Sequence, residues 1–241
     1  MDKDCQFYNI GYQVFKASHD LWSKDIRVPF ENYFLRELSK FQGRKNINRL
    51  EDYHKAFKSE SSLKHHEFIK KISRTLPKNI INLNSDYLEF IKLKASILVN
   101  KKVEISEDLI EFRVVRPHTK DNNNLHRDHW FPHFYSLINI YLPIAGSEFR
   151  SVLRVIPKSH LWKEEEVIPT FKAGQGKKTV NEDGIKYSTP NIKYCKYDLK
   201  EHRPDVLQGD FMLFSPLTIH GGGSNATNKT RFSLEIRSKI I

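Results

Sequence analysis

The chain has 241 residues, of which 39% are hydrophobic, 12% aromatic and 29% charged, and its formal net charge is +11. This length suits one domain with a sizeable core, and the composition is typical of a globular protein rather than a disordered one. Two cysteines are too few for a disulfide framework, no apolar stretch approaches the ~20 residues of a membrane span, and the acidic opening over residues 1–4 is not typical of a signal peptide, so we expect a cytoplasmic protein.

The positive charge raises the question of an anionic partner. A nucleic-acid-binding domain should show a dense basic run with interleaved aromatic residues, zinc-finger spacing or an RNA-binding signature, and the sequence has none of these. We therefore expect no nucleic-acid partner. An anionic small substrate explains the charge as well as lysines on solvated faces do.

The first hundred residues show helical periodicity. Apolar residues recur at helical spacing over residues 14–41, and Pro29 is expected to divide this run into two helices. A further helix should begin at Ser61 or Ser62, and another should cover 84–98. The amino-terminal portion, residues 1–105, is therefore predicted to be mainly helical.

The period changes to two from residue 108. Alternating patterns predict half-buried strands over residues 110–115, 137–142 and 231–237. Helices followed by strands favour an α+β protein whose strands form a sandwich or barrel, and no boundary divides residues 1–241 into two domains. The long irregular segment 163–205 is a candidate lid.

The tripeptide His126-Arg127-Asp128 places an imidazole and a carboxylate two residues apart. On a strand such residues point the same way, so both could reach one metal ion. His-X-Asp is frequent by chance, however, and a hydrogen-bonded pair in a surface loop is the alternative interpretation.

His220 strengthens the metal interpretation. It follows the turn Gly209-Asp210 and an apolar strand, and it precedes three glycines at 221–223 that allow close backbone approaches. A core histidine beside a glycine-rich turn is the alternative. Because two histidines and one carboxylate form the facial triad typical of non-haem Fe(II), we predict iron at His126, Asp128 and His220.

Arg231 begins the last strong strand. The opposite face of that strand carries three apolar residues, Phe232, Leu234 and Ile236. If these pack outward against helices, Arg231 points inward, where its planar guanidinium suits a carboxylate such as the distal one of 2-oxoglutarate. Ser233 shares this face and could donate a further hydrogen bond. Glu235 and Glu111 are the alternative partners of Arg231.

Five further residues are candidates for the pocket: Asn139, Tyr141, Trp130, Arg127 and Arg113. Asn139 and Tyr141 share the expected inward face of their strand, and each either contacts 2-oxoglutarate or makes a structural hydrogen bond. Trp130 either walls the pocket or belongs to the core. Arg127 and Arg113 favour an anionic substrate if they rim the pocket, although Arg127 should point away from both metal ligands on a regular strand.

From about residue 108 to 237 the chain resembles the phytanoyl-CoA dioxygenase-like family of Fe(II)/2-oxoglutarate oxygenases. Four landmarks carry the resemblance in order: His126-Arg127-Asp128, the segment 153–160, Gly209-Asp210 before His220, and Arg231 with Ser233. The segment 153–160 is similar to the Val-Ile-Pro-Gly-Ser-His stretch of the family, with Lys158 in place of the usual glycine. Arg150-Ser151 stand where Asn-Gly is common, and the first hundred residues show no specific match.

The resemblance implies a double-stranded β-helix (a cupin-like jelly roll) over residues 106–241, with helices mostly from the first hundred residues packed on one sheet. It also implies that 2-oxoglutarate chelates Fe(II), that O2 binds, and that succinate and CO2 form while a small molecule is oxidised, usually by hydroxylation. Amino acids, sugars and nucleotide-linked sugars in biosynthetic pathways are the expected substrate classes.

Several alternatives remain open at this stage. Desaturation, epimerisation or ring formation would use the same cofactors, and a protein or RNA hydroxylase is a further alternative. Halogenation is disfavoured, because halogenases of this family replace the metal carboxylate by a small residue whereas Asp128 is present. A non-catalytic jelly-roll binding module is disfavoured by the joint presence of the three metal ligands and Arg231. The sequence does not indicate an oligomeric state.

Overall fold

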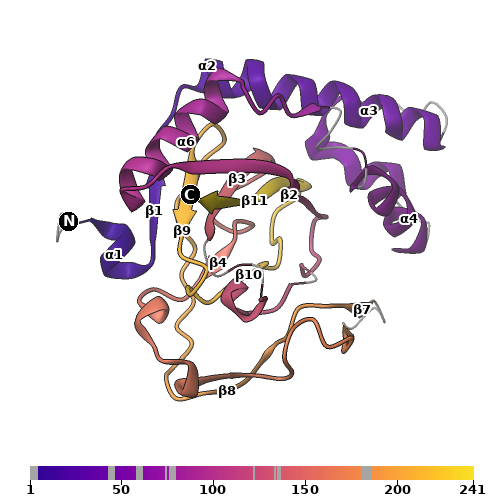
Figure 1. The fold of residues 1–241 in the computed structure, drawn as a ribbon. Coiled ribbons are helices and arrows are strands. Elements are labelled where there is room, and N and C mark those ends of the chain that lie inside the picture. The colour runs from indigo at the N-terminus through magenta and orange to yellow at the C-terminus, as the bar shows by residue number, and fades with distance from the viewer. Residues whose placement is uncertain are drawn as a thin grey trace.

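The computed structural model describes residues 5–42, 47–57, 62–73, 75, 80–121, 123–132, 134, 137–180 and 186–241. Its centre is a five-stranded antiparallel sheet (Figure 1). In spatial order the strands are β1 (Tyr12–Phe15), β9 (Phe211–Phe214), β3 (Leu137–Ala145), β11 (Arg231–Ile240) and β2 (Val103–Val115). The longest alternating segments of the sequence thus form the middle and one edge of this sheet.

Helices from the amino-terminal part cover one face of the sheet (Figure 1). They are α1 (Gln6–Ile10), α2 (His19–Trp22), η1 (Ser23–Arg27), α3 (Val28–Gln42), η2 (Leu50–Phe57), α4 (Ser62–Ser73) and α6 (Asp86–Val99). The core between helices and sheet is aromatic: the fully buried ring of Phe34 contacts the rings of Tyr53, Phe68 and Phe232. The mixed helix-and-sheet class expected from the sequence is confirmed.

One feature of the amino-terminal portion differs from the prediction. Residues 14 and 15, expected to begin a helix, belong to the edge strand β1, because they pair with β9. The expected start of a second helix at Pro29 is confirmed: α3 begins at Val28, directly after the π-helical turn η1, and has the proline in its first turn. The predicted helix over 84–98 is confirmed as α6, and the predicted start at Ser61 or Ser62 is confirmed as α4; Ser61 lies outside the described residues.

The other face of the sheet packs against a smaller wall. This wall contains the antiparallel pair β4 (Arg154–Val155) and β10 (His220–Gly221), and single bridges join His126 to His220 and Val155 to His202. A second apolar cluster fills the space between, with Tyr141, Met212 and Phe214 from the sheet and Val152, Leu153 and Val155 from the wall. The metal-ligand candidates therefore lie where the wall meets the inner face of the sheet.

The segment 163–205 is more regular than its sequence suggests. It contains the turn η5 (Glu164–Glu166) and two strand pairs, β5 (Val167–Pro169) with β8 (Ile192–Cys195) and β6 (Thr179–Val180) with β7 (Lys186–Tyr187). In Figure 1 it forms the lower arm of the molecule, away from the helical layer.

The alternating sequence of β11 gives this strand one apolar face and one polar face. Phe232, Leu234 and Ile236 join the aromatic core under the helices, as the sequence predicted. The intervening residues Arg231, Ser233, Glu235 and Arg237 must face the interior between sheet and wall. These four residues are polar or charged, and all of them are buried. The inner surface of the sheet is therefore both enclosed and charged.

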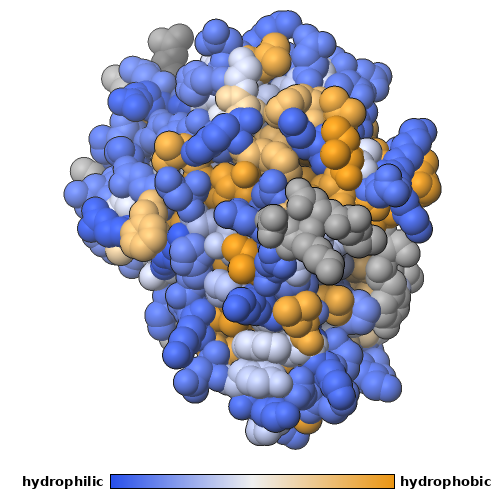
Figure 2. Space-filling model, turned by 90° about the vertical axis from the view of Figure 1, so that its left-hand side faces the viewer, coloured by the Kyte–Doolittle hydropathy of each residue, from blue (hydrophilic) through white to orange (hydrophobic). Residues whose placement is uncertain are grey.

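Figure 2 shows one face of the molecular surface. The face in Figure 2 is predominantly hydrophilic and carries separate hydrophobic patches. Among the described residues, no helix is long and apolar enough to cross a membrane.

Candidate metal centre

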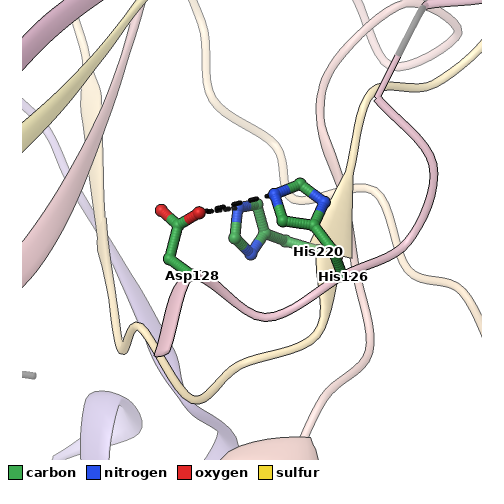
Figure 3. Close-up of side chains that lie close together, drawn as sticks. All are labelled: His126, Asp128 and His220. Atoms are coloured by element: carbon green, nitrogen blue, oxygen red, sulfur yellow. Dashed lines mark ion pairs between the residues drawn. The ribbon is translucent and has the colours of Figure 1, made fainter. Parts of the chain in front are cut away.

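His126, Asp128 and His220 converge at the junction of wall and sheet (Figure 3). Backbone hydrogen bonds of 2.9 and 3.0 Å pair His126 with His220, and the two ring centroids are 4.4 Å apart. Arg127 is extended, with φ −112° and ψ 133°, so Asp128 points to the same side as His126 although it already begins the turn η3 (Asp128–Trp130). The prediction that His126 and Asp128 point to the same side is therefore correct, although these residues do not belong to a long strand.

The three ligand atoms have the spacing that one metal ion requires. Oδ1 of Asp128 lies 3.4 Å from Nε2 of His126 and 3.9 Å from Nε2 of His220. All three ligand atoms lie within 4.8 Å of one another, and none of the residues is more than 2% exposed. Such a set could hold a divalent cation on one side and leave its other side open.

Both imidazoles are prepared to act as neutral ligands. Nδ1 of His126 lies 2.7 Å from the carbonyl oxygen of Asn124, and Nδ1 of His220 lies 3.0 Å from that of Thr218. A carbonyl only accepts, so each Nδ1 carries the hydrogen and each Nε2 presents a lone pair. Burial, and then the neighbouring His126, lowers the pKa of His220 to about 3, which keeps that ring neutral.

The carboxylate of Asp128 is fixed from behind. Its Oδ2 accepts hydrogen bonds from Nδ2 of Asn139 at 3.0 Å and from Nε of Arg237 at 2.8 Å. Burial alone would raise the pKa of Asp128, but Arg237 and the two histidines outweigh it and hold that pKa well below its usual range. The acid is thus ionised, as a metal ligand must be.

The loop before His220 is held by the amino-terminal segment. The carbonyl oxygen of Gly11 accepts from Oγ1 of Thr218 at 2.9 Å and from the backbone N–H of Ser215 at 3.0 Å. Gly11 has φ +93°, and a Cβ there would lie 2.5 Å from Oγ1 of Thr218. Position 11 therefore requires a glycine, and this glycine supports Thr218, whose own carbonyl oxygen orients the ring of His220.

Arg231 lies fully buried on the same inner face. Its Nη1 donates to the carbonyl oxygen of Ser151 at 2.8 Å and its Nη2 donates to Oδ2 of Asp121 at 2.6 Å. The carboxylate partner is therefore Asp121, neither Glu235 nor Glu111. Nε of Arg231 has no partner among the described residues.

Further polar atoms on this inner face are unpaired. Oγ of Ser233, the hydroxyl of Tyr141 and Oδ1 of Asn139 are buried and lack hydrogen-bond partners in the described part of the chain. An unsatisfied buried polar atom costs about 1–3 kcal/mol, so such a group of atoms favours a polar molecule bound among them. The hydroxyls of Ser233 and Tyr141 can donate, so together with Arg231 they suit a small dicarboxylate, whereas Oδ1 of Asn139 only accepts.

Two residues predicted to belong to the pocket have other environments. Arg127 is fully buried and points away from the triad; it donates to Oε1 of Glu164 at 2.7 Å and to the carbonyl oxygens of Ser159 and Trp162 at 2.6 and 3.0 Å. It therefore anchors the start of the segment 163–205, on the side of the extended backbone opposite to the two metal ligands. Trp130 is partly buried and packs against a small apolar cluster around Ile156.

Arg113 does face the interior, from β2. It is paired with Oε2 of Glu235 at 3.2 Å and with Oε2 of Glu111 at 2.9 Å, and its side chain is 23% exposed. Sequence reasoning missed Arg237 and Asp121. Arg237 has the same parity as Arg231 on one strand and could have been found by that signal, whereas Asp121 lies in a loop whose position no local pattern specifies.

Lys158 has a backbone conformation that favours glycine. Its φ is +67° at the start of the turn η4 (Ser159–Leu161), in the left-handed region. Oγ of Ser159 accepts from the N–H of Ile219 at 2.8 Å, so this turn supports the residue next to His220. A lysine therefore stands at a position whose left-handed backbone conformation is typical of glycine.

Fold and site together define a non-haem iron oxygenase, in which two histidines and one carboxylate leave coordination positions open. The chain belongs to the phytanoyl-CoA dioxygenase (PhyH) family, which it matches over residues 37–233. It is accordingly an iron- and 2-oxoglutarate-dependent dioxygenase, with Fe(II), 2-oxoglutarate and O2 as cofactor and co-substrates. The chain has no match among curated proteins.

Solved structures share the fold at low sequence identity. The non-haem α-ketoglutarate-dependent carbocyclase SnoK from nogalamycin biosynthesis is 13% identical, with all of this chain and 84% of that one covered and a TM-score of 0.53. EvdO2 from Micromonospora carbonacea var. aurantiaca, complexed with 2-oxoglutarate, is 11% identical over 98% of this chain and 90% of that one, with a TM-score of 0.51. The non-haem monooxygenase ThoJ is 10% identical over 98% and 76%, with a TM-score of 0.54.

Proposed function

We propose that this chain hydroxylates a small molecule, with release of succinate and CO2 from 2-oxoglutarate. The observation that carries the proposal is the convergence of Nε2 of His126, Nε2 of His220 and Oδ1 of Asp128 beside a set of buried, unpaired polar atoms. When bound, iron would supply the activation of O2 for oxidation of a substrate C–H bond, and 2-oxoglutarate would supply two of the four electrons that O2 takes up as it is converted to succinate and CO2. The residues of this chain bind and orient these groups and exclude water.

Each part of the inner face has a role in this proposal. His126, Asp128 and His220 hold the iron, and Arg231 holds the distal carboxylate of 2-oxoglutarate with help from Ser233. Three inward residues complete the enclosure: Asn139, Tyr141 and Arg113. We propose that Asn139 and Tyr141 contact 2-oxoglutarate, Tyr141 through its buried, unpaired hydroxyl and Asn139 through Nδ2, which has a second hydrogen besides the one it donates to Asp128. The proposal of an anionic substrate rests on the net charge and on Arg113.

The wall and the sheet support a more specific description of the fold. We propose that they are the two sheets of one double-stranded β-helix in a single domain over residues 1–241. The apolar cluster shared by wall and sheet supports this arrangement. Residues 163–205 would then be a lid over the open end, tethered at their start by the ion pair of Arg127 with Glu164.

Hydroxylation is the most general outcome of this chemistry. Desaturation, epimerisation and ring formation remain alternatives, because the same residues would hold the same cofactors in each case. A protein or RNA hydroxylase also remains an alternative. Analysis of the product by mass identifies the outcome, since hydroxylation adds one oxygen atom whereas desaturation removes two hydrogen atoms.

The decisive experiment measures anaerobic binding of Fe(II) and 2-oxoglutarate, followed by a screen of small metabolites for accelerated succinate release. Asp128→Ala should abolish iron binding and turnover. Because it also removes an ion-pair partner of the buried Arg237, the isosteric Asp128→Asn, which keeps a hydrogen-bond acceptor there, is tested beside it and should be equally inactive. Asp86→Ala is the matched control, because that carboxylate is on the outer helix α6 with its side chain 72% exposed. Normal turnover in Asp128→Ala at saturating iron would remove the triad from the mechanism.

A further inference from the structure

Two arginines of β11 face the interior, and only Arg231 is expected to bind the co-substrate. The second, Arg237, is 6% exposed and lies against Asp128. Its Nε is 2.8 Å from Oδ2 of Asp128 and its Nη2 is 3.4 Å from Oδ1. Its Cζ lies over the ring of Phe134, 5.0 Å from the ring centroid.

The two oxygens of Asp128 have different surroundings as a result. Oδ2 receives two donors at 2.8 and 3.0 Å, Nε of Arg237 and Nδ2 of Asn139, whereas Oδ1 receives one longer contact of 3.4 Å from Nη2 of Arg237 and is turned toward the two histidines (Figure 3). An oxygen that already accepts two hydrogen bonds is a poor metal ligand, because its lone pairs are engaged. Only Oδ1 is then available to the iron.

We propose that Arg237 is a positioning residue that, with Asn139, makes Asp128 a one-oxygen ligand of the iron. The proposal rests on the proposed function of this site. A carboxylate that used both oxygens would occupy an additional coordination position. Too few positions would then remain for a chelating co-substrate and for oxygen, so restricting Asp128 to one oxygen keeps the centre open.

The neighbouring acids make this arrangement electrostatically acceptable. A guanidinium beside a divalent cation would weaken metal binding unless its charge were compensated. Nη1 of Arg237 is 3.5 Å from Oε1 of Glu111, and its Nη2 is 4.0 Å from Oε2 of Glu235. Both acids also pair with Arg113, so alternating charges continue along the inner face away from the metal.

The test uses Co(II) as a probe, because its visible absorption reports the coordination number and needs no turnover. Arg237→Gln should weaken Co(II) binding about 10- to 100-fold, as loss of a residue that orients a ligand usually does, and should change the absorption of the bound ion. Arg237→Lys keeps the buried charge, so it should fold and recover part of the affinity while its absorption stays altered. Arg27→Gln is the matched control, because Arg27 is also paired with two carboxylates, at 2.9 and 3.1 Å, but on the helical side.

Unchanged Co(II) affinity and absorption in both folded Arg237 variants would overturn the inference and leave the proposed function standing. Failure of the wild-type chain to bind Co(II) or 2-oxoglutarate would instead overturn both. A loss of affinity in Arg27→Gln equal to that in Arg237→Gln would show a general loss of stability and would also overturn the positioning role.

Discussion

Replacing Arg231 removes two interactions at once, and the structure allows them to be separated. In Arg231→Ala the carboxylate of Asp121 loses its partner at 2.6 Å, although its side chain is only 5% exposed. Leaving one member of a buried ion pair unpaired costs about 3–5 kcal/mol. We therefore expect Arg231→Ala to be strongly destabilised, and the double variant Arg231→Ala/Asp121→Asn to recover most of that loss because no buried charge remains.

The double variant then isolates the co-substrate contact. A lost charge-assisted contact to a carboxylate should cost about 2–4 kcal/mol, which corresponds to an increase in Kd of about 30- to 900-fold. Arg231→Lys should recover only part of this, because an ammonium cannot present two parallel donors. Asp121→Asn alone should bind 2-oxoglutarate at least as tightly as the wild type, because the guanidinium then has no competing carboxylate.

The assay is anaerobic calorimetric titration of 2-oxoglutarate into the metal-loaded protein, with urea unfolding of each variant in parallel. A double variant that binds 2-oxoglutarate with wild-type affinity would refute the assignment of Arg231. Equal stability of Arg231→Ala and wild type would refute the argument about Asp121.

Three further predictions concern stability. Lys158→Gly should raise the free energy of unfolding by up to about 1 kcal/mol. The φ of +67° costs an L-residue about 1–2 kcal/mol, and the additional backbone entropy that glycine loses on folding, about 0.5–1 kcal/mol, offsets part of this gain. A lower urea midpoint for Lys158→Gly would contradict this prediction. Burial lowers the pKa of His65 from 6.5 to about 3, so the unfolded chain binds the proton first; the resulting stability is complete above pH 6.5 and declines as the pH falls toward 3. The apoprotein should therefore lose about 2 kcal/mol between pH 7 and pH 5 through this group, and His65→Gln should lack that contribution in urea unfolding at the two pH values. Gly146→Ala should lower the Tm severely, because its Cβ would lie 2.1 Å from the carbonyl oxygen of Thr230. Gly174 has φ +83° and no atom within 4 Å of the added Cβ, so Gly174→Ala should lower the free energy of unfolding by only about 1–2 kcal/mol. Similar Tm values for the two variants would refute the steric argument.

The inner face of β11 could be predicted from the sequence because alternation is a local property. The apolar side chains at 232, 234 and 236 were expected to pack in the core under the helices, and this expectation was enough to predict that Arg231 and Ser233 point to the opposite face of the strand. The same alternation correctly predicted that the side chain of Arg127 points away from the two metal ligands. A role of Arg127 in the pocket required a bulge in the backbone, and the conformation of Arg127 is extended. Local pattern therefore predicted both the strand and its orientation.

Features that depend on distant partners could not be predicted in this way. Val14 and Phe15 have apolar side chains compatible with a helix, and they are strand only because β9, nearly 200 residues later, supplies the hydrogen bonds. Asp121 pairs with Arg231 across 110 residues, from a loop without a repeating pattern. Tertiary contacts override local propensity at both positions.

The support of His220 by Gly11 has a consequence for the order in which the protein can assemble. Gly11 and Thr218 are separated by 207 positions, so β1 leaves the ribosome long before β9 and the loop that carries His220. At about 5–20 residues per second the interval is about 10–40 s, during which the edge strand has no partner. Contacts of such long range slow folding and leave an unpaired edge open to other chains. The metal centre is therefore expected to form only after nearly the whole chain has been synthesised, and iron can be captured only at the end of folding.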